Sequence, residues 1–150
     1  MASKVEVEVE LKSKPEKLWN AIKDYTTLFS KAAPDKYERS EVLEGDGISV
    51  GTVALMKKTE AYGDSVTKQR LESLDEGNKT LVYSVIEGDV LEYLKNYKAT
   101  FHVSEKGDGA LVTYIVEMEA ASEQVPDLAL LKGFVIELLH QIDAYLLNEA

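Results

Sequence analysis

The stretch from Pro126 to Asn148 constrains the fold of this chain more than any other segment. Its apolar residues recur at spacings of three and four, which is the period of an amphipathic helix; they are Leu128, Leu131, Val135, Leu138, Leu139, Ile142 and Leu146. Further apolar residues widen this stripe, so that the charged residues are confined to a narrow strip around Lys132, Glu137, Asp143 and Glu149. About 22 helical residues span roughly 33 Å, the width of a small domain. We therefore expect the rest of the chain to wrap around this helix.

The first part of the chain predicts one strand followed by two short helices. Residues 4–12 alternate valine or leucine with glutamate, which is typical of a strand with one buried and one solvated face. Ser13 and Pro15 then give a helix-start signal, and apolar residues follow at helical spacing as far as Tyr25. A second short helix is predicted over residues 26–35, with Pro34 as its stop.

From Tyr37 onward the pattern changes to strands separated by turns. Six strands are predicted, over residues 37–45, 51–62, 66–75, 79–89, 91–105 and 110–120. The segments between them carry the glycine, aspartate and asparagine that tight turns require. Residues 122–127 form the one linker before the final helix. Short connections indicate an antiparallel meander, and the first strand brings the number to seven. We predict an α+β fold in which a curved antiparallel sheet grips the last helix, as one domain over residues 1–150.

The composition narrows the classes of partner. The chain has 27 acidic and 17 basic residues and a formal net charge of −10, whereas a nucleic-acid or anionic-membrane surface needs a clustered basic face. It has no cysteine, which excludes disulfides and a sulfur-ligated zinc site. No run approaches the roughly 18 apolar residues of a membrane span, and the first residues lack the apolar core of a secretory signal. We expect a soluble, cytoplasmic protein without metal or cofactor, either a monomer or a weak dimer.

A glycine-rich loop follows the second predicted strand. Gly45, Gly47 and Gly51 are spaced GxGxxxG, a pattern that in other contexts cradles phosphate. Here no helix and no GK[ST] ending follows, and Asp46 would repel a phosphate. We interpret the loop as a conformational element rather than a nucleotide site.

The order of the predicted elements is that of a known family, and four segments carry the likeness. They are PEKLWNAI (15–22), EGDGISVGT (44–52), YSVIEGD (83–89) and IDAYLLN (142–148). Together they resemble the plant major latex protein family, within the birch-pollen-allergen (pathogenesis-related class 10), START-like superfamily. The resemblance implies a helix-grip fold whose internal cavity accepts small hydrophobic or amphipathic plant metabolites. Some members of that superfamily are carriers or receptors, and others are enzymes that cyclise, condense or isomerise reactive metabolites.

The resemblance also implies which side chains line the cavity. These are Ile22, Leu28, Phe29, Leu81, Tyr83, Val85, Leu131, Phe134, Val135 and Leu138. On the residues alone, plain core packing is the simpler interpretation of these positions, and the resemblance reverses that preference. Tyr83 combines an apolar ring with one hydroxyl, so it is a candidate for ligand contact or acid–base catalysis. His102 is the second catalytic candidate because an imidazole ordinarily has a pKa near neutrality, although a surface or hydrogen-bonded structural role is the simpler interpretation of this residue.

Several other polar side chains stay open at this stage. No pattern fixes which residues face inward after Gly88, so Tyr93 and Tyr97 are less securely placed than Tyr83. His140 is expected to be a surface or hydrogen-bonded residue. A desolvated inward lysine could act as a base or form an iminium ion, although strand lysines mostly lie on solvated faces; the lysines considered are Lys57, Lys68, Lys95 and Lys98.

The sequence therefore supports two functions that share one cavity. The first is a carrier, sensor or defence-related protein that binds a small hydrophobic or amphipathic metabolite. The alternative is an enzyme of specialised metabolism, a cofactor-independent cyclase, isomerase or lyase, which holds a reactive intermediate in a productive conformation. Such shape-steered catalysis needs no recognisable triad, so the residues do not separate the two.

Overall fold

The computed structural model describes residues 2–62, 65–88, 91, 94–120 and 128–148. Seven strands are present, which confirms the predicted number. They are β1 (Ala2–Leu11), β2 (Tyr37–Glu44), β3 (Val53–Lys58), β4 (Val66–Asp75), β5 (Thr80–Gly88), β6 (Leu94–Lys106) and β7 (Gly109–Ala120). The helices are α1 (Pro15–Lys23), α2 (Tyr25–Ala32) and α3 (Leu128–Leu147), and a short 3-10 turn, η1, spans Glu60–Tyr62.

The strands form one antiparallel sheet in the order β1-β7-β6-β5-β4-β3-β2. Strands β2 to β7 pair in chain order, as a meander requires, and β1 pairs with β7 from Ala2 opposite Glu119 to Leu11 opposite Ala110. Because β1 and β2 occupy the two edges, α1 and α2 carry the chain from one edge to the other. Register shifts interrupt the β2–β3, β4–β5 and β6–β7 pairings, and such bulges bend strands and increase their twist.

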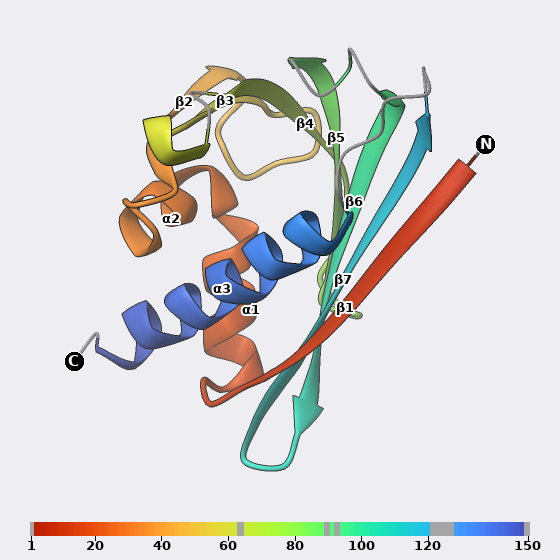
Figure 1. Ribbon diagram of the computed structural model, residues 1–150. Coiled ribbons are helices and arrows are strands. Elements are labelled where there is room, and N and C mark those ends of the chain that lie inside the picture. Colours follow the sequence, from red (N-terminus) through yellow and green to blue (C-terminus); the bar gives the residue numbers. More distant parts are fainter. Residues whose placement is uncertain (1, 63–64, 89–90, 92–93, 121–127, 149–150) are drawn as a thin grey trace.

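All three helices lie on one side of the sheet. Figure 1 shows α3 (blue) crossing that side, with α1 and α2 beside it and the β2–β4 end of the sheet bending over toward the helices. This arrangement is the predicted helix grip. The side of the sheet that faces the helices is called the inner face below.

The alternation predicted for the first strand is confirmed. In β1 the side chains of Val5, Val7 and Val9 are buried, whereas Glu6 and Glu8 are exposed. The same period of two continues through β5, β6 and β7, and the buried side chains of these four strands, apart from Val85, join one hydrophobic cluster with the helices. Removing this apolar surface from water is the main favourable term in folding.

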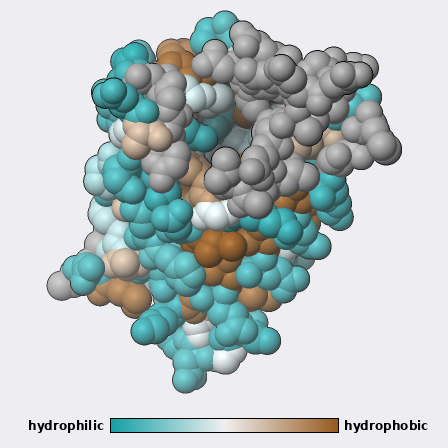
Figure 2. Space-filling view, in the orientation of Figure 1, coloured by the Kyte–Doolittle hydropathy of each residue, from teal (hydrophilic) through white to brown (hydrophobic). Residues whose placement is uncertain are grey.

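The covering of α3 is less complete than its composition predicts. Ile136 is 38% exposed and Leu147 is 53% exposed. Figure 2 shows brown apolar surface breaking through the hydrophilic surface on the side where α3 lies. The buried residues follow the predicted spacing; they are Val135, Leu138, Leu139, Ile142 and Leu146.

Asp143, which we predicted on the charged strip of this helix, is only 6% exposed. Its Oδ1 accepts hydrogen bonds from the backbone N–H of Ser13 at 2.9 Å and from the Ser13 hydroxyl at 2.6 Å, and its Oδ2 accepts from the Lys12 N–H at 3.1 Å. In addition, Lys17 Nζ donates to the Leu146 carbonyl oxygen at 2.7 Å. These bonds fasten the C-terminal half of α3 to the segment between β1 and α1.

One further local prediction needs correction. The third strand ends at Lys58, and η1 occupies Glu60–Tyr62, which we had assigned to the end of that strand. The predicted start of the first helix at Ser13 to Pro15 is confirmed: Lys14 is the N-cap residue of α1, and its side chain makes no cap hydrogen bond. The Ser13 hydroxyl is bonded to Asp143. Tyr93 and the predicted linker at 122–127 lie outside the described residues.

Candidate functional site

Three tyrosines from adjacent strands meet on the inner face. Tyr83 on β5 and Tyr97 on β6 both contact Tyr114 on β7, with hydroxyl–hydroxyl distances of 3.1 Å and 3.3 Å. Tyr83 and Tyr114 are buried and Tyr97 is half-buried against the same core. This group of three is called the tyrosine cluster below. Its position settles the parity of β6, because Tyr97 shares a face with Ala99 and Phe101.

The tyrosine cluster has more hydrogen-bond donors than it uses internally. Each hydroxyl carries one proton and can also accept, so three hydroxyls joined by two bonds leave at least one donor over. Tyr25 on α2 stacks on Tyr83 with ring centroids 5.1 Å apart. It is 1% exposed, and its hydroxyl has no hydrogen-bond partner among the described residues. A buried polar group without a partner is costly, so this region can bond to a polar group that enters it.

Burial fixes the protonation state of these tyrosines. It raises the pKa of Tyr83 and Tyr114 well above the ordinary tyrosine value, and it also raises the pKa of Tyr25 and of Tyr97. The reason is that a phenolate loses its hydration inside the protein. At neutral pH the four hydroxyls are therefore protonated, so they serve as hydrogen-bond donors and acceptors rather than as bases.

A second group lies where β3 meets α3. The Nζ of Lys58 is 4.3 Å from the centre of the Phe134 ring, and the Nζ of Lys36 is 5.8 Å from the same ring. Lys36 is buried and lies 3.3 Å from Asp35 Oδ2 and 3.8 Å from Glu137 Oε1. The sequence analysis did not single out either lysine. The available signal was that Lys58 shares the parity of the apolar residues Ala54 and Met56, both of which are buried.

The residues predicted to line a cavity all lie between the sheet and the helices. Phe134 and Leu131 are half-buried at the margin of the core. Val85 is buried on β5 but is not part of the hydrophobic cluster. The other seven are buried members of that cluster: Ile22, Leu28, Phe29, Leu81, Tyr83, Val135 and Leu138.

The remaining polar candidates face away from this region. His102 is half-buried on the outer face, opposite in parity to Phe101 and Val103, and its Nδ1 shares a 2.8 Å hydrogen bond with the Thr80 hydroxyl. It therefore does not line the inner face, and we assign it no catalytic part. His140 is exposed on α3.

Of the lysines considered from the sequence, the three whose side chains the structure describes do not supply an inward amine. Lys57 pairs with Glu38, and Lys68 lies 2.9 Å from Glu87. Lys98 is exposed, and the side chain of Lys95 lies outside what the structure describes.

The glycine loop supplies its own anion. Asp46 Oδ1 accepts from the N–H groups of Ile48 and Ser49 at 2.9 Å and 2.8 Å, and Oδ2 accepts from the Ser49 hydroxyl at 2.6 Å. These bonds lower the pKa of Asp46 to about 2, led by the bond from the serine hydroxyl. Gly45 and Gly47 have φ values of 87° and 93°, which favour glycine. The N–H groups that a phosphate would need are already bonded, in agreement with a conformational role.

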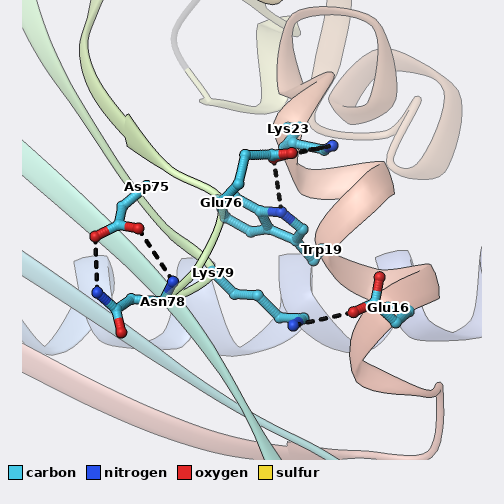
Figure 3. Close-up of polar contacts among 7 residues, drawn as sticks. All are labelled: Glu16, Trp19, Lys23, Asp75, Glu76, Asn78 and Lys79. Carbon is cyan, nitrogen blue, oxygen red and sulfur yellow. Dashed lines mark hydrogen bonds and ion pairs between the residues drawn. The ribbon is translucent and has the colours of Figure 1, made fainter.

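A surface groove of about 480 Å³ lies at the other end of α1, beside the β4–β5 turn. Figure 3 shows the contacts around it: Glu76 accepts from the Trp19 indole N–H at 3.0 Å, and Lys79 Nζ lies 3.0 Å from Glu16. Lys14 Nζ, also in its lining, donates to the Asp108 carbonyl oxygen. Both lysines of the lining, Lys14 and Lys79, are thus engaged within the protein, so neither is available to hold an anionic ligand. We therefore do not place the functional site here.

Comparison with known proteins identifies the family to which this geometry belongs. The model of the pathogenesis-related protein Bet v 1 family matches residues 1–149. The chain belongs to the Bet v 1 family. Within this family it is similar to MLP-like protein 423 of Arabidopsis thaliana, at 37% identity over 95% of this chain and 93% of that protein. MLP-like protein 43 of the same plant is 30% identical over 99% and 96%. The predicted resemblance to major latex proteins is confirmed.

Solved structures of Bet v 1 family proteins share the fold. Ginseng major latex-like protein 151 from Panax ginseng superposes with a TM-score of 0.90 at 23% identity, covering 97% of this chain and 98% of that one. Norcoclaurine synthase from Thalictrum flavum, in complex with dopamine and hydroxybenzaldehyde, superposes with a TM-score of 0.79 at 18% identity, covering 100% and 89%. At these identities the likeness shows the fold alone.

Two features of the described residues bear on membrane and metal binding. Of the helices described, none combines the length and apolarity that crossing a bilayer requires. Among the described side chains, no three histidine, aspartate or glutamate residues are grouped as metal ligands would be.

Proposed function

We propose that this protein binds a small, mostly apolar metabolite between the inner face of the sheet and α3, as a carrier or sensor. The observation that carries this proposal is the tyrosine cluster. It places spare hydroxyl donors inside an otherwise apolar region, and ligand sites are typically apolar surfaces with a few placed polar groups. The hydroxyl of Tyr25 beside it, which has no hydrogen-bond partner among the described residues, supports the same role. Membership of the Bet v 1 family, whose members bind small hydrophobic ligands, supports it further.

A cofactor-independent cyclase, isomerase or lyase is the second candidate. Its support is chemical: protonated tyrosines can donate to a developing negative charge on a reacting carbonyl, and Lys58 offers a half-buried amine. The raised tyrosine pKa values argue against a tyrosine as general base. We keep the cytoplasm as the predicted location and the monomer as the predicted state.

One experiment separates the two functions. The purified protein is incubated with a panel of plant metabolites and reactive aldehydes, and retained ligand and products are analysed by mass spectrometry. Unchanged ligand bound in stoichiometric amount supports the carrier and counts against catalysis for that panel. Faster or stereochemically biased product formation supports the enzyme.

The tyrosine cluster provides the matched variants for this experiment. Tyr114→Phe removes the central hydroxyl and keeps the ring, so it should weaken binding of hydroxyl- or carbonyl-bearing ligands about fivefold, the loss of one ordinary hydrogen bond. Tyr145→Phe, in a half-buried tyrosine of α3 outside the cluster, is the control. If the two variants change ligand affinity equally, or if neither changes it, the tyrosine cluster is not part of the binding site.

A further inference from the structure

Lys58 is the one lysine of β3 that faces inward. Its place in the strand is set by Ala54 and Met56, which are almost completely buried and share its parity. Opposite it in the β2–β3 register lies Tyr37, whose ring is 5.9 Å from that of Phe134. Its neighbour Lys57 has the other parity and pairs with Glu38. Two consecutive lysines therefore have opposite environments.

Lys58 has no counter-ion in the part of the chain that the structure describes. No carboxylate among those residues lies within ion-pair distance of its Nζ, although the chain has 27 acidic residues. Lys36, the other ammonium near the Phe134 ring, lies beside Asp35 and Glu137. An ammonium group removed from water is costly unless an opposite charge compensates it, and burial lowers the pKa of Lys58 accordingly.

The Phe134 ring compensates this charge only in part. A cation over an aromatic face is worth about 0.5–2 kcal/mol, and the ring satisfies one side of a group that carries three N–H donors. From Phe134 a row of aromatic rings continues through Tyr37 to Phe29. The ring centroids of Tyr37 and Phe29 are 5.3 Å apart. Phe29 is in turn 5.7 Å from Tyr25 at the edge of the tyrosine cluster. The Lys58 ammonium therefore lies at one end of this row of aromatic rings, and the neutral hydroxyls of the tyrosine cluster lie at the other end.

We propose that Lys58 binds the anionic group, in the simplest case a carboxylate, of an amphipathic ligand whose apolar body lies along the Phe134 side of the inner face. This inference rests on the proposed function, because it names the chemical class of ligand for the same site. It distinguishes amphipathic acids from neutral molecules of the same shape. An acid both neutralises the ammonium and satisfies its remaining N–H donors, whereas a neutral amide or alcohol does only the second.

The test compares acids with neutral partners of matched shape. The probes are naphthalene-2-acetate with naphthalene-2-acetamide, and nonanoate with 1-nonanol, each titrated calorimetrically at pH 7.5. The wild-type protein should bind each acid at least about tenfold more tightly than its neutral partner, as one charge-assisted hydrogen bond implies. Lys58→Met should remove that preference by weakening acid binding and should change neutral binding less than about twofold. Lys57→Met, one position away on the outer face, should change neither.

Each contrary result has a separate meaning. Equal binding of acid and neutral partner by the wild-type protein overturns the inference and leaves the proposed function standing. If Lys58→Met loses affinity for the acid and for its neutral partner to a similar degree, the inference is also overturned and the proposed function stands, because the side chain then contributes shape rather than charge. Failure of all four probes to bind counts against both. If Lys58→Met does not fold, Lys58→Gln supplies the comparison, and Lys58→Arg should retain the acid preference.

Discussion

Asp143 fastens α3 to the segment between β1 and α1, and replacing it tests how much of the fold depends on that attachment. Its carboxylate accepts two buried hydrogen bonds from Ser13 and one partly exposed bond from the Lys12 N–H. In Asp143→Ala water can replace the exposed bond but not the buried pair. At about 1.5 kcal/mol for each bond to a charged group, the variant should lose about 3 kcal/mol of unfolding free energy. For a chain of this length, that loss lowers Tm by roughly 9 °C.

The assay uses a reporter that the protein already carries. Trp19 is the one tryptophan of the chain and is 2% exposed, so its fluorescence should follow unfolding in urea. Ser13→Ala and the double variant complete a mutant cycle, in which we expect a coupling of at least about 1 kcal/mol. Lys132→Ala, at an exposed position of the same helix, is the control and should change stability by less than about 0.5 kcal/mol. A loss below about 1 kcal/mol for Asp143→Ala, or negligible coupling to Ser13, would refute the assignment.

The same attachment predicts a pH dependence. Burial alone would raise the pKa of Asp143, but the hydrogen bonds from Ser13 and Lys12 outweigh it and hold the pKa below the ordinary aspartate value. A group whose pKa is lowered by folding stabilises the protein above its unfolded pKa of ~3.9. That stabilisation disappears as the pH falls through the lower, folded pKa. The stability difference between wild type and Asp143→Ala should therefore be constant near neutrality and shrink below about pH 4; a constant difference down to pH 2 would contradict this reasoning.

Three further substitutions test other parts of the structure. Gly109→Ala should prevent folding, because its Cβ would lie 2.1 Å from a backbone carbonyl oxygen of β1. Gly107→Ala is the control: its Cβ would meet no atom, so the variant should lose only ~1–2 kcal/mol of stability for its φ of 56°. Similar melting temperatures of the two variants would contradict the clash. Glu76→Gln replaces a charged acceptor of the Trp19 indole N–H by a neutral one, so the fluorescence maximum of the folded protein should shift, and an unchanged spectrum would place the indole elsewhere. Phe134→Ala should alter the size preference for ligands while leaving the protein folded, as circular dichroism and calorimetry can check; unfolding would assign Phe134 to the core.

The sequence predicted the sheet and the helices because their signals are local. Alternation in residues 4–12 and turn residues between the later strands specify which side chains face inward wherever the period of two is unbroken. Bulges break that period, and nothing in the sequence carries it across the residues after Gly88, so the inward position of Tyr97 could not be derived. Lys58 was passed over in favour of Lys57 because the two adjacent lysines look alike until the parity of β3 is counted from Ala54.

Contacts between segments far apart in the chain account for the other errors. Asp143 looks solvent-exposed when α3 is considered alone, since an isolated helix gives no sign that Ser13 and Lys12 will cover it. The hydrogen bond between the hydroxyls of Tyr83 and Tyr114 likewise depends on the pairing of β5, β6 and β7. The family resemblance placed Tyr83 on the inner face, but it did not identify Tyr114 or Lys58.

The pairing of β1 with β7 has a consequence for the way in which the chain folds. Val5 leaves the ribosome well before its partner Val116, and the helix that covers both strands follows later still. Closing so long a loop costs entropy before any contact offsets it, and folding rates fall as contacts become more distant in sequence. During synthesis the valine face of β1 is therefore exposed until β7 has emerged. We expect β1 to join the sheet after the local pairings of β2 to β7 have formed.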